Sequence, residues 1–177
     1  MRIIAGTHRG RALKSPTWPG LRPTSDRLRE TLFNILAPRV AGARVLDVYA
    51  GTGAVALEAL SRGAACAVCI ESNRRAQALI AANRATMGED ARCIIVGADA
   101  RRALGAPVAG GPFDIVFLDP PYDADELAAV ADAAAAQRAE GGVLVVEHAS
   151  RRPPPLVGGR PPDRSVKAGD STLSFYS

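Results

Sequence analysis

Acidic side chains follow several apolar stretches of this sequence, in an order that could build a nucleoside-binding site. The loop Ala50-Gly51-Thr52-Gly53 comes directly after the first apolar stretch, and its glycines would let a ligand approach the backbone closely. Glu71 lies eighteen residues beyond Gly53, where a carboxylate can accept hydrogen bonds from two ribose hydroxyls. Asp99 follows the third stretch and could accept from an adenine amino group. These residues together predict a nucleoside ligand.

The glycine loop does not by itself decide which nucleoside binds. Gly51-x-Gly53-x-x-Ala56 also fits the relaxed fingerprint of dinucleotide-binding proteins, so NAD stays open as an alternative at this point. A nicotinamide oxidoreductase would also need an acid or base for hydride transfer, and the chain offers no obvious one.

A sharper pattern is Asp119-Pro120-Pro121-Tyr122, directly after the apolar run 114–118. Two prolines stiffen the backbone, so a carboxylate and a carbonyl become fixed acceptors beside an aromatic ring. An exocyclic base amine needs that arrangement, because its lone pair is delocalised until acceptors hold both N–H groups. The ring of Tyr122 could stack on the base. The tetrapeptide therefore predicts chemistry at an exocyclic amine.

Strands and helices must alternate to bring these residues to one place. Apolar runs predict strands, and residues with helical periodicity lie between them. This alternation indicates βαβ units and a mostly parallel sheet covered on both faces, with the ligand at the carboxyl ends of the strands. The predicted strands are 44–49, 65–70, 92–97, 114–119 and 142–147, and the predicted helices are 54–61, 74–87, 101–104 and 125–140.

Further elements flank this alternating region. Residues 2–5 and 11–14 predict a hairpin around glycines, and Ser25 or Asp26 can cap a helix that runs to Pro38. Its apolar residues Leu28, Leu32, Ile35 and Leu36 would share one face. The Pro- and Gly-rich residues 151–163 predict a loop, and 165–168 with 171–176 predict a final hairpin. His148, just past the fifth strand, is interpreted as a surface or packing residue.

Composition and charge narrow the class of protein. A chain of 177 residues with 47% hydrophobic and 23% charged residues has the make-up of a soluble globular domain. No apolar run approaches the roughly 18 residues of a membrane helix, and the N-terminus does not resemble a signal peptide, so a cytoplasmic location is expected. Residues 1–39 carry eight Lys or Arg against two acids, whereas 40–150 carry nine against fourteen. A basic segment on an acidic body is typical of polyanion binding.

The three cysteines are predicted to be reduced core thiols. Cys66-x-x-Cys69 has the spacing of a metal pair, but no second pair of ligands accompanies it. In a strand, a spacing of three directs the two side chains to opposite faces. Cys93 is expected to lie in the core as well, and no metal is expected.

These motifs resemble one known family. Asp47-x-x-x-Gly51-x-Gly53, Glu71, Asp99 and Asp119-Pro-Pro-Tyr122 look like Rossmann-type amino methyltransferases. Arg2-Ile-Ile-Ala-Gly6, Arg9-Gly-Arg11, the segment Leu21–Leu36 and Leu57–Gly63 resemble the RsmD family of bacterial 16S ribosomal RNA guanine-N2 methyltransferases. The resemblance covers about residues 1–150, and Gly169–Leu173 with Tyr176 is similar near the end.

The resemblance implies a three-layer α/β/α methyltransferase fold with an antiparallel C-terminal hairpin and a small N-terminal hairpin extension. It implies S-adenosylmethionine as cofactor and S-adenosylhomocysteine as product. Asp47 and the loop Gly51–Gly53 would hold the methionine part, Glu71 the ribose, and Asp99 with the Ala100 N–H the adenine. Asp119 and the Pro120 carbonyl would accept from the target amine, with Tyr122 stacked on the base. The implied catalytic residues are Asp119, Pro120, Pro121 and Tyr122, and the implied cofactor residues are Asp47, Tyr49, Gly51, Gly53, Glu71, Ser72, Asp99, Ala100 and Asp119.

The same resemblance divides the chain into an RNA-docking extension, 1–39, and a methyltransferase domain, 40–177. The implied partner is small-subunit ribosomal RNA, either free or within an assembling particle, bound by a monomer away from membranes. An adenine-N6 methyltransferase on DNA or RNA stays an alternative, as does a non-catalytic RNA-binding assembly factor. The predicted RNA contacts are His8, Arg9, Arg11, Arg22, Thr24 and Arg27.

Overall fold

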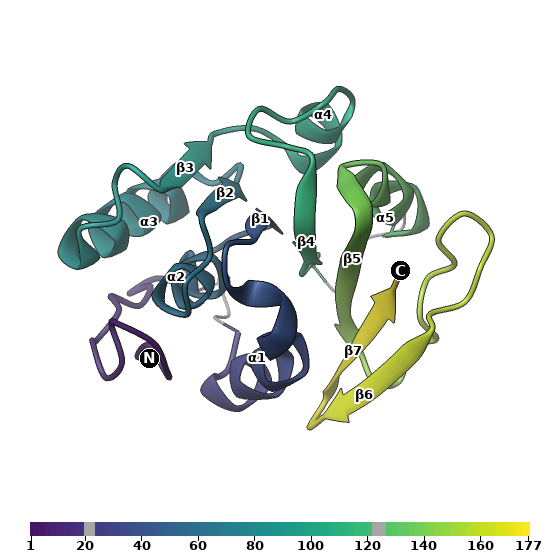
Figure 1. The fold of residues 1–177 in the computed structure, drawn as a ribbon, viewed down its shortest axis with the longest axis horizontal. Helices are drawn as coiled ribbons and strands as arrows, with labels where there is room; N and C mark the ends of the chain where they lie inside the picture. The colour runs from purple at the N-terminus through teal and green to yellow at the C-terminus, as the bar shows by residue number, and fades with distance from the viewer. Residues whose placement is uncertain (20–23, 122–126) are drawn as a thin grey trace.

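A computed structural model describes residues 1–19, 24–121 and 127–177 of the chain. Its centre is a seven-stranded sheet in the order β3-β2-β1-β4-β5-β7-β6 (Figure 1). The first five strands are parallel, and β7 pairs antiparallel with both β5 and β6. The strands are β1 (Arg44–Val48), β2 (Cys66–Ile70), β3 (Cys93–Val96), β4 (Phe113–Leu118), β5 (Arg138–Ala149), β6 (Arg164–Ala168) and β7 (Ser171–Tyr176). The predicted α/β fold, with its C-terminal hairpin, is confirmed.

Helices cover both faces of the sheet and make three layers. Residues of α1, α2 and α3 share one hydrophobic core with one face, and residues of α4 and α5 share a second core with the other. No helix in the described part of the chain is long and apolar enough to cross a membrane. The helices are α1 (Asp26–Val40), α2 (Ala54–Ser61), α3 (Arg74–Met87), α4 (Ala100–Leu104) and α5 (Leu127–Ala135).

Local sequence signals account for most of these boundaries. Ser25 accepts a hydrogen bond from the Leu28 N–H and caps α1, and Asn73 caps α3 in the same way. Gly88 ends α3 in the left-handed conformation that favours glycine. The predicted ranges for α2 and α3 match the observed ones, and α1 runs two residues past Pro38.

The prediction of one helix from 125 to 140 is wrong at its C-terminal end. Helix α5 ends at Ala135, and Arg138 already begins β5, where it pairs with Phe113 of β4. Between them the Gln137 carbonyl accepts from the Phe113 N–H at 2.9 Å. Alanine favours helix locally, but pairing with a buried neighbouring strand outweighs that preference. Residues 122–126 lie outside the described residues.

The N-terminal hairpin is held by the body of the protein more than by its own strand pairing. Only Arg2 and Ala12 form a β-bridge, so the two predicted strands are not regular ones. The fully buried Glu58 of α2 accepts from the Ile4 N–H at 2.8 Å and from the Ala5 N–H at 3.0 Å. Gly6, with φ of +84°, sits so close to α2 that a Cβ would be 1.8 Å from the Ser61 carbonyl oxygen. The hairpin therefore docks on α2.

The prediction that the cysteines lie in the core agrees with the structure at two of the three positions. Cys69 and Cys93 are buried, and their sulfur atoms lie 3.9 Å apart across adjacent strands, whereas Cys66 is only half-buried. His148 is a packing residue: it is buried, and its Nε2 lies 2.9 Å from the Ser174 hydroxyl.

Candidate active site

The carboxyl ends of five neighbouring strands meet at one edge of the sheet. The glycine loop follows β1, and β1 lies between β2 and β4. An acidic residue stands at or just past the end of each of the other four strands, which brings the predicted residues of 44–119 to the same edge of the sheet. These acids are Glu71 after β2, Asp99 after β3, Asp119 after β4 and Glu147 near the end of β5.

The loop after β1 has the backbone of a ligand cradle. Gly51 and Gly53 adopt φ of +55° and +75°, and Tyr49 also has a positive φ of 63°, which is uncommon for a residue with a bulky side chain. At Gly53 a Cβ would lie 3.0 Å from the Ile80 side chain. Glycine is therefore favoured at Gly51 and Gly53, where a side chain would be strained or would clash with Ile80.

Glu71 connects this loop to the end of β2. Its carboxylate accepts from the Gly51 N–H at 2.9 Å and from the Asn73 N–H at 2.8 Å, and its side chain is half-buried. The adjacent Ser72 is exposed. A half-buried carboxylate beside a glycine loop fits the diol of a nucleoside ribose, so these residues suit the cofactor that the sequence implies.

Asp99 caps α4 by accepting from the Arg101 and Arg102 N–H groups. The Asp99 side chain is exposed, whereas Ala100 is buried. The carboxylate can therefore meet the edge of a base while it holds the start of α4. The adenine contact of Asp99 and Ala100 stays a prediction.

Asp47 is buried and is hydrogen-bonded to the helix that follows the glycine loop. It is 2% exposed, and its Oδ2 accepts from the Ala56 N–H of α2 at 3.1 Å. Its carboxyl is thus directed at the first turn of α2, and its contact with the methionine part of a cofactor stays a prediction. Burial raises the pKa of Asp47 to about 7, the Ala56 hydrogen bond opposes this shift, and the charge of Glu71 adds to it.

We expect Asp47→Asn to flatten the pH dependence of stability. Because folding raises the pKa of Asp47 from 3.8 to about 7, the folded state holds an extra proton between those values. The stability from protonated Asp47 is complete below pH 4 and is lost as pH rises through about 7. Asparagine keeps an acceptor for Ala56 without the charge. Between pH 5 and pH 8.5, the free energy of unfolding measured in urea should fall by about 1–4 kcal/mol more for wild type than for the variant. An equal fall in both proteins would contradict this assignment.

Asp119 lies at the centre of the edge. Its N–H donates to the Val48 carbonyl at 3.3 Å, and its Oδ2 accepts from the Thr24 hydroxyl at 3.3 Å. Thr24 precedes α1 by two residues, so the basic N-terminal segment reaches the candidate acceptor directly. Pro120 is buried and Pro121 is exposed, and Tyr122 lies outside the described residues.

The sequence interpretation missed Glu147. In the register of β4 with β5, Leu118 is beside Val146, so the next residues, Asp119 and Glu147, are neighbours. Glu147 is 4% exposed, and its carboxyl lies beside that of Asp119. Burial, followed by the charges of Glu147 and Asp47, raises the pKa of Asp119 well above its ordinary value. An acid directly after the apolar run 143–146 was the available signal.

The predicted RNA contacts divide into two groups. His8 lies 2.8 Å from the buried Glu89, Arg11 donates to the Thr86 carbonyl, and Thr24 donates to Asp119, so each has a partner within the protein. Arg9 and Arg27 are exposed, and Arg22 lies outside the described residues. All six contacts with RNA stay predictions.

The arrangement combines a nucleoside cradle with a rigid pair of acceptors at the adjacent strand end. An amine held by the Asp119 carboxyl and the Pro120 carbonyl would have its lone pair directed away from both. Group transfer to such an amine needs a donor bound next to it, and the glycine loop lies one strand away. The geometry therefore supports transfer between a nucleoside cofactor and an exocyclic amine.

Comparison with known proteins gives results that agree with this geometry. Residues 1–177 match the family described as conserved hypothetical protein 95. The chain is 48% identical to ribosomal RNA small subunit methyltransferase D of Escherichia coli over 122 residues, or 69% of this chain and 60% of that protein. It is 34% identical to a putative rRNA methyltransferase, YlbH, of Bacillus subtilis over 84% of this chain and 82% of that protein. The solved structure of a putative methyltransferase, yhhF, of Escherichia coli has a TM-score of 0.86 at 38% identity, covering 99% of this chain and 96% of that one.

Proposed function

This chain belongs to the conserved hypothetical protein 95 family, the RsmD family, and on that premise we propose that it is a ribosomal RNA methyltransferase. The proposed reaction moves a methyl group from S-adenosylmethionine to the N2 amine of a guanine in small-subunit ribosomal RNA. The name of the Escherichia coli relative supports this substrate, although the match spans 60% of that relative's length. The observation that carries the proposal is the Asp119-Pro120 acceptor pair beside the glycine loop.

The residues of the chain would act mainly by positioning. Gly51, Gly53 and Glu71 would hold the cofactor, and Asp99 would contact its adenine. Asp47 would hold the start of α2, next to the loop. When bound, S-adenosylmethionine supplies a methyl group that its sulfonium makes electrophilic. Asp119 and the Pro120 carbonyl would accept the two N–H groups of the target, which frees the nitrogen lone pair to form the new N–C bond.

Glu147 gives the proton of the product a place to go. The methylated amine carries one proton more than its neutral product and must lose it. Two neighbouring carboxyls, of which Glu147 is buried, are expected to share a proton rather than both ionise, as paired carboxylates do. Asp119 would therefore be an orienting acceptor, and the Asp119–Glu147 pair or solvent would take the released proton.

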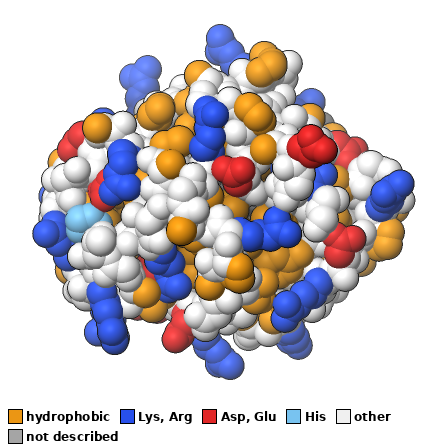
Figure 2. Space-filling view, in the orientation of Figure 1, with side chains coloured by type: hydrophobic (Ala, Val, Ile, Leu, Met, Phe, Trp, Pro, Cys, Tyr) orange, Lys and Arg blue, Asp and Glu red, His pale blue; other side chains and the backbone are white. Residues whose placement is uncertain are grey.

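The RNA would dock over the N-terminal segment. Figure 2 shows Lys and Arg side chains around much of the outline of this face, with fewer acidic side chains between them. Exposed Arg9 and Arg27 would contact phosphates, which fixes the register of the RNA without reading its sequence. The target guanine must leave its stack, which favours a loop or bulge over a duplex.

Calorimetry tests the cofactor. We expect S-adenosylmethionine and S-adenosylhomocysteine to bind the wild-type protein and NAD to fail, because the Gly51 N–H already donates to the Glu71 carboxylate and is not free to meet a pyrophosphate. Glu71→Ala should lower the affinity for S-adenosylmethionine and S-adenosylhomocysteine, because it removes the ribose acceptor and the hydrogen bond to Gly51. Glu140→Ala, at an exposed position, should leave both affinities unchanged. Tighter binding of NAD would reject the methyltransferase proposal.

The identity of the base needs a separate measurement, because a pair of fixed acceptors suits adenine N6 as well as guanine N2. Mass spectrometry of ribosomal RNA nucleosides from cells with and without this gene should show the loss of a methylguanine. Loss of a methyladenine instead would support methyl transfer to an exocyclic amine but would show that the target base is adenine.

A further inference from the structure

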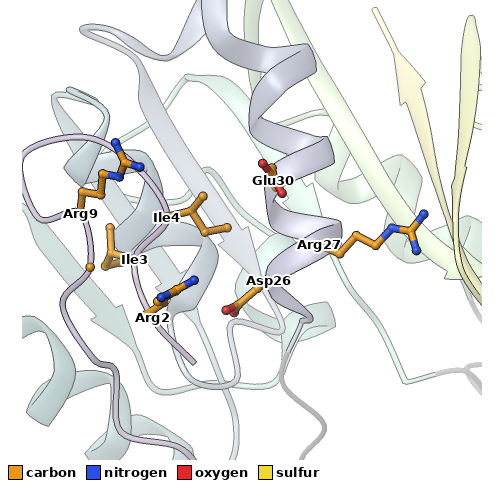
Figure 3. A pocket seen from close by; sticks show the side chains of 8 residues that line it. Arg2, Ile3, Ile4, Arg9, Asp26, Arg27 and Glu30 are labelled. Atoms are coloured by element: carbon orange, nitrogen blue, oxygen red, sulfur yellow. The ribbon is translucent and has the colours of Figure 1, made fainter.

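A cavity lies between the N-terminal hairpin and the first turns of α1. Its volume is about 410 Å³, within the range of small-molecule pockets. Figure 3 shows Arg2 and Ile4 of the hairpin pointing toward α1, Asp26 directed back toward the hairpin, and Arg27 pointing away from it. Glu30 lines the cavity one turn along α1 from Asp26. The cavity thus combines two apolar side chains, Ile3 and Ile4, with three arginines and two carboxylates.

The buried guanidinium of Arg29 connects the two walls of this cavity. Arg29 is fully buried, and its Nη2 donates to the Arg2 carbonyl at 2.6 Å and to the Asp26 carboxylate at 2.7 Å. This one side chain therefore ties the hairpin wall to the helix wall. It also pairs with Asp26, which leaves Glu30 as the lining carboxylate that has no ion-pair partner within the described residues. The walls are held in place before any ligand binds.

The cavity is also close to the candidate acceptor. Thr24 donates to Asp119, and Asp26 lies two residues further along the chain, which spans about 7 Å at most. A nucleotide bound in the cavity would therefore be near the nucleotide whose base reaches Asp119.

We propose that this cavity is a second base pocket, which holds a guanine of the same RNA close to the methylated one. This inference rests on the proposed function and adds a specificity site to it. Glu30 would accept from the N1 and N2 N–H groups of the base, Arg2 would donate to O6 or to the adjoining phosphate, and Ile4 would pack against the ring. Glu30 and Arg2 have no ion pair or side-chain hydrogen bond within the described chain, so both are available.

The cavity has groups for a base and for the phosphate that carries it. Arg2, Arg9 and Arg27 line the space and suit the phosphate, whereas Glu30 would repel a phosphate placed beside it and suits the base. The same carboxylate matches the donor edge of guanine, whereas adenine and cytosine each present only an amino group there. The half-buried Ile4 gives an apolar surface, which a phosphate would not need.

Short single-stranded RNAs test the pocket. The probes are nine-residue RNAs with a central guanosine, uridine elsewhere and one further guanosine scanned through the other positions, with S-adenosylhomocysteine present. Fluorescence anisotropy with wild-type protein should show one position where the extra guanosine tightens binding about 5- to 150-fold, the range of a good bidentate contact. Inosine at that position, which lacks the N2 amine, should lose most of the gain.

Glu30→Gln separates the pocket from general electrostatics. Removing a negative charge should slightly tighten binding of the all-uridine RNA, yet the pocket requires the variant to lose the guanosine preference to within about twofold. Glu140→Gln makes the same change at an exposed site at the start of β5 and should keep the wild-type preference. Absence of a preferred position in wild type, or its survival in Glu30→Gln, overturns the inference.

Methyl incorporation, measured separately, distinguishes the two proposals. If the protein methylates RNA but shows no guanosine preference, only the proposal of a second base pocket is rejected. If the protein shows the preference but methylates neither free RNA nor small subunits lacking the modification, the proposed function is rejected and the proposal of the pocket stands.

Discussion

Asp119→Ala is expected to lower the rate of methyl transfer to RNA by roughly 30- to 900-fold. This corresponds to about 2–4 kcal/mol of barrier, the usual loss for one preorganised polar contact in an active site. Without the carboxyl, one N–H of the target amine has no fixed acceptor and the lone pair stays delocalised. Initial rates of methyl incorporation measure the effect, and calorimetry should show cofactor affinity within a few-fold of wild type, because Glu71 and the glycine loop are unchanged.

Two further variants show whether the effect is specific. Asp119→Asn keeps an oxygen acceptor and matches the proton-bearing state that burial and Glu147 favour, so its loss should be clearly smaller than that of alanine. Asp90→Ala alters a mostly exposed aspartate at the opposite end of β3 and should have normal activity. Near-wild-type turnover in Asp119→Ala would show that the acceptor is another group.

Glu58→Ala is expected to lower the free energy of unfolding by about 3–5 kcal/mol, the range for breaking a buried ion pair. The fully buried carboxylate accepts from the Ile4 and Ala5 N–H groups and from Arg62 Nε at 2.7 Å. Alanine leaves all three donors without that acceptor and removes one of the attachments of the hairpin, beside those to Ser61 and Asn83. Urea unfolding measures the loss, and hydrogen exchange should show the Ile4 and Ala5 amides losing protection first.

The same variant should also weaken RNA binding more than cofactor binding, since the hairpin carries one wall of the proposed docking surface. Glu58→Gln keeps one acceptor oxygen and should fall between alanine and wild type in stability. Glu140→Ala is the matched control, because that glutamate is exposed. An unfolding free energy of Glu58→Ala within 1 kcal/mol of wild type would mean that the hairpin is held chiefly by its apolar contacts.

Much of the architecture could be predicted from residue patterns. Helices at 54–61 and 74–87, the five parallel strands and the C-terminal hairpin all follow from periodicity and from residues such as Asn73 that cap locally. The crevice also follows, because parallel strands deliver their carboxyl ends to one edge and the acids stand just past those ends. The family resemblance then assigned chemistry to residues that spacing alone left open between two cofactors.

Other features depend on contacts between residues far apart in the chain. Glu147 became part of the site through the register of β4 with β5, and Thr24 through a hydrogen bond to a residue 95 positions away. The hydrogen bond between the buried carboxyl of Asp47 and the Ala56 N–H of α2 also could not be predicted from the sequence.

The sequence by itself therefore determined which elements form, in what order, and which chemical groups stand at their ends. Periodicity and capping act within a few residues, so they can be read along the chain. The tertiary structure decided which groups face one another, which lose their water, and where helix preference yields to strand pairing, as at Arg138. Those outcomes depend on burial and on partners across the fold, and no local pattern of residues contains them.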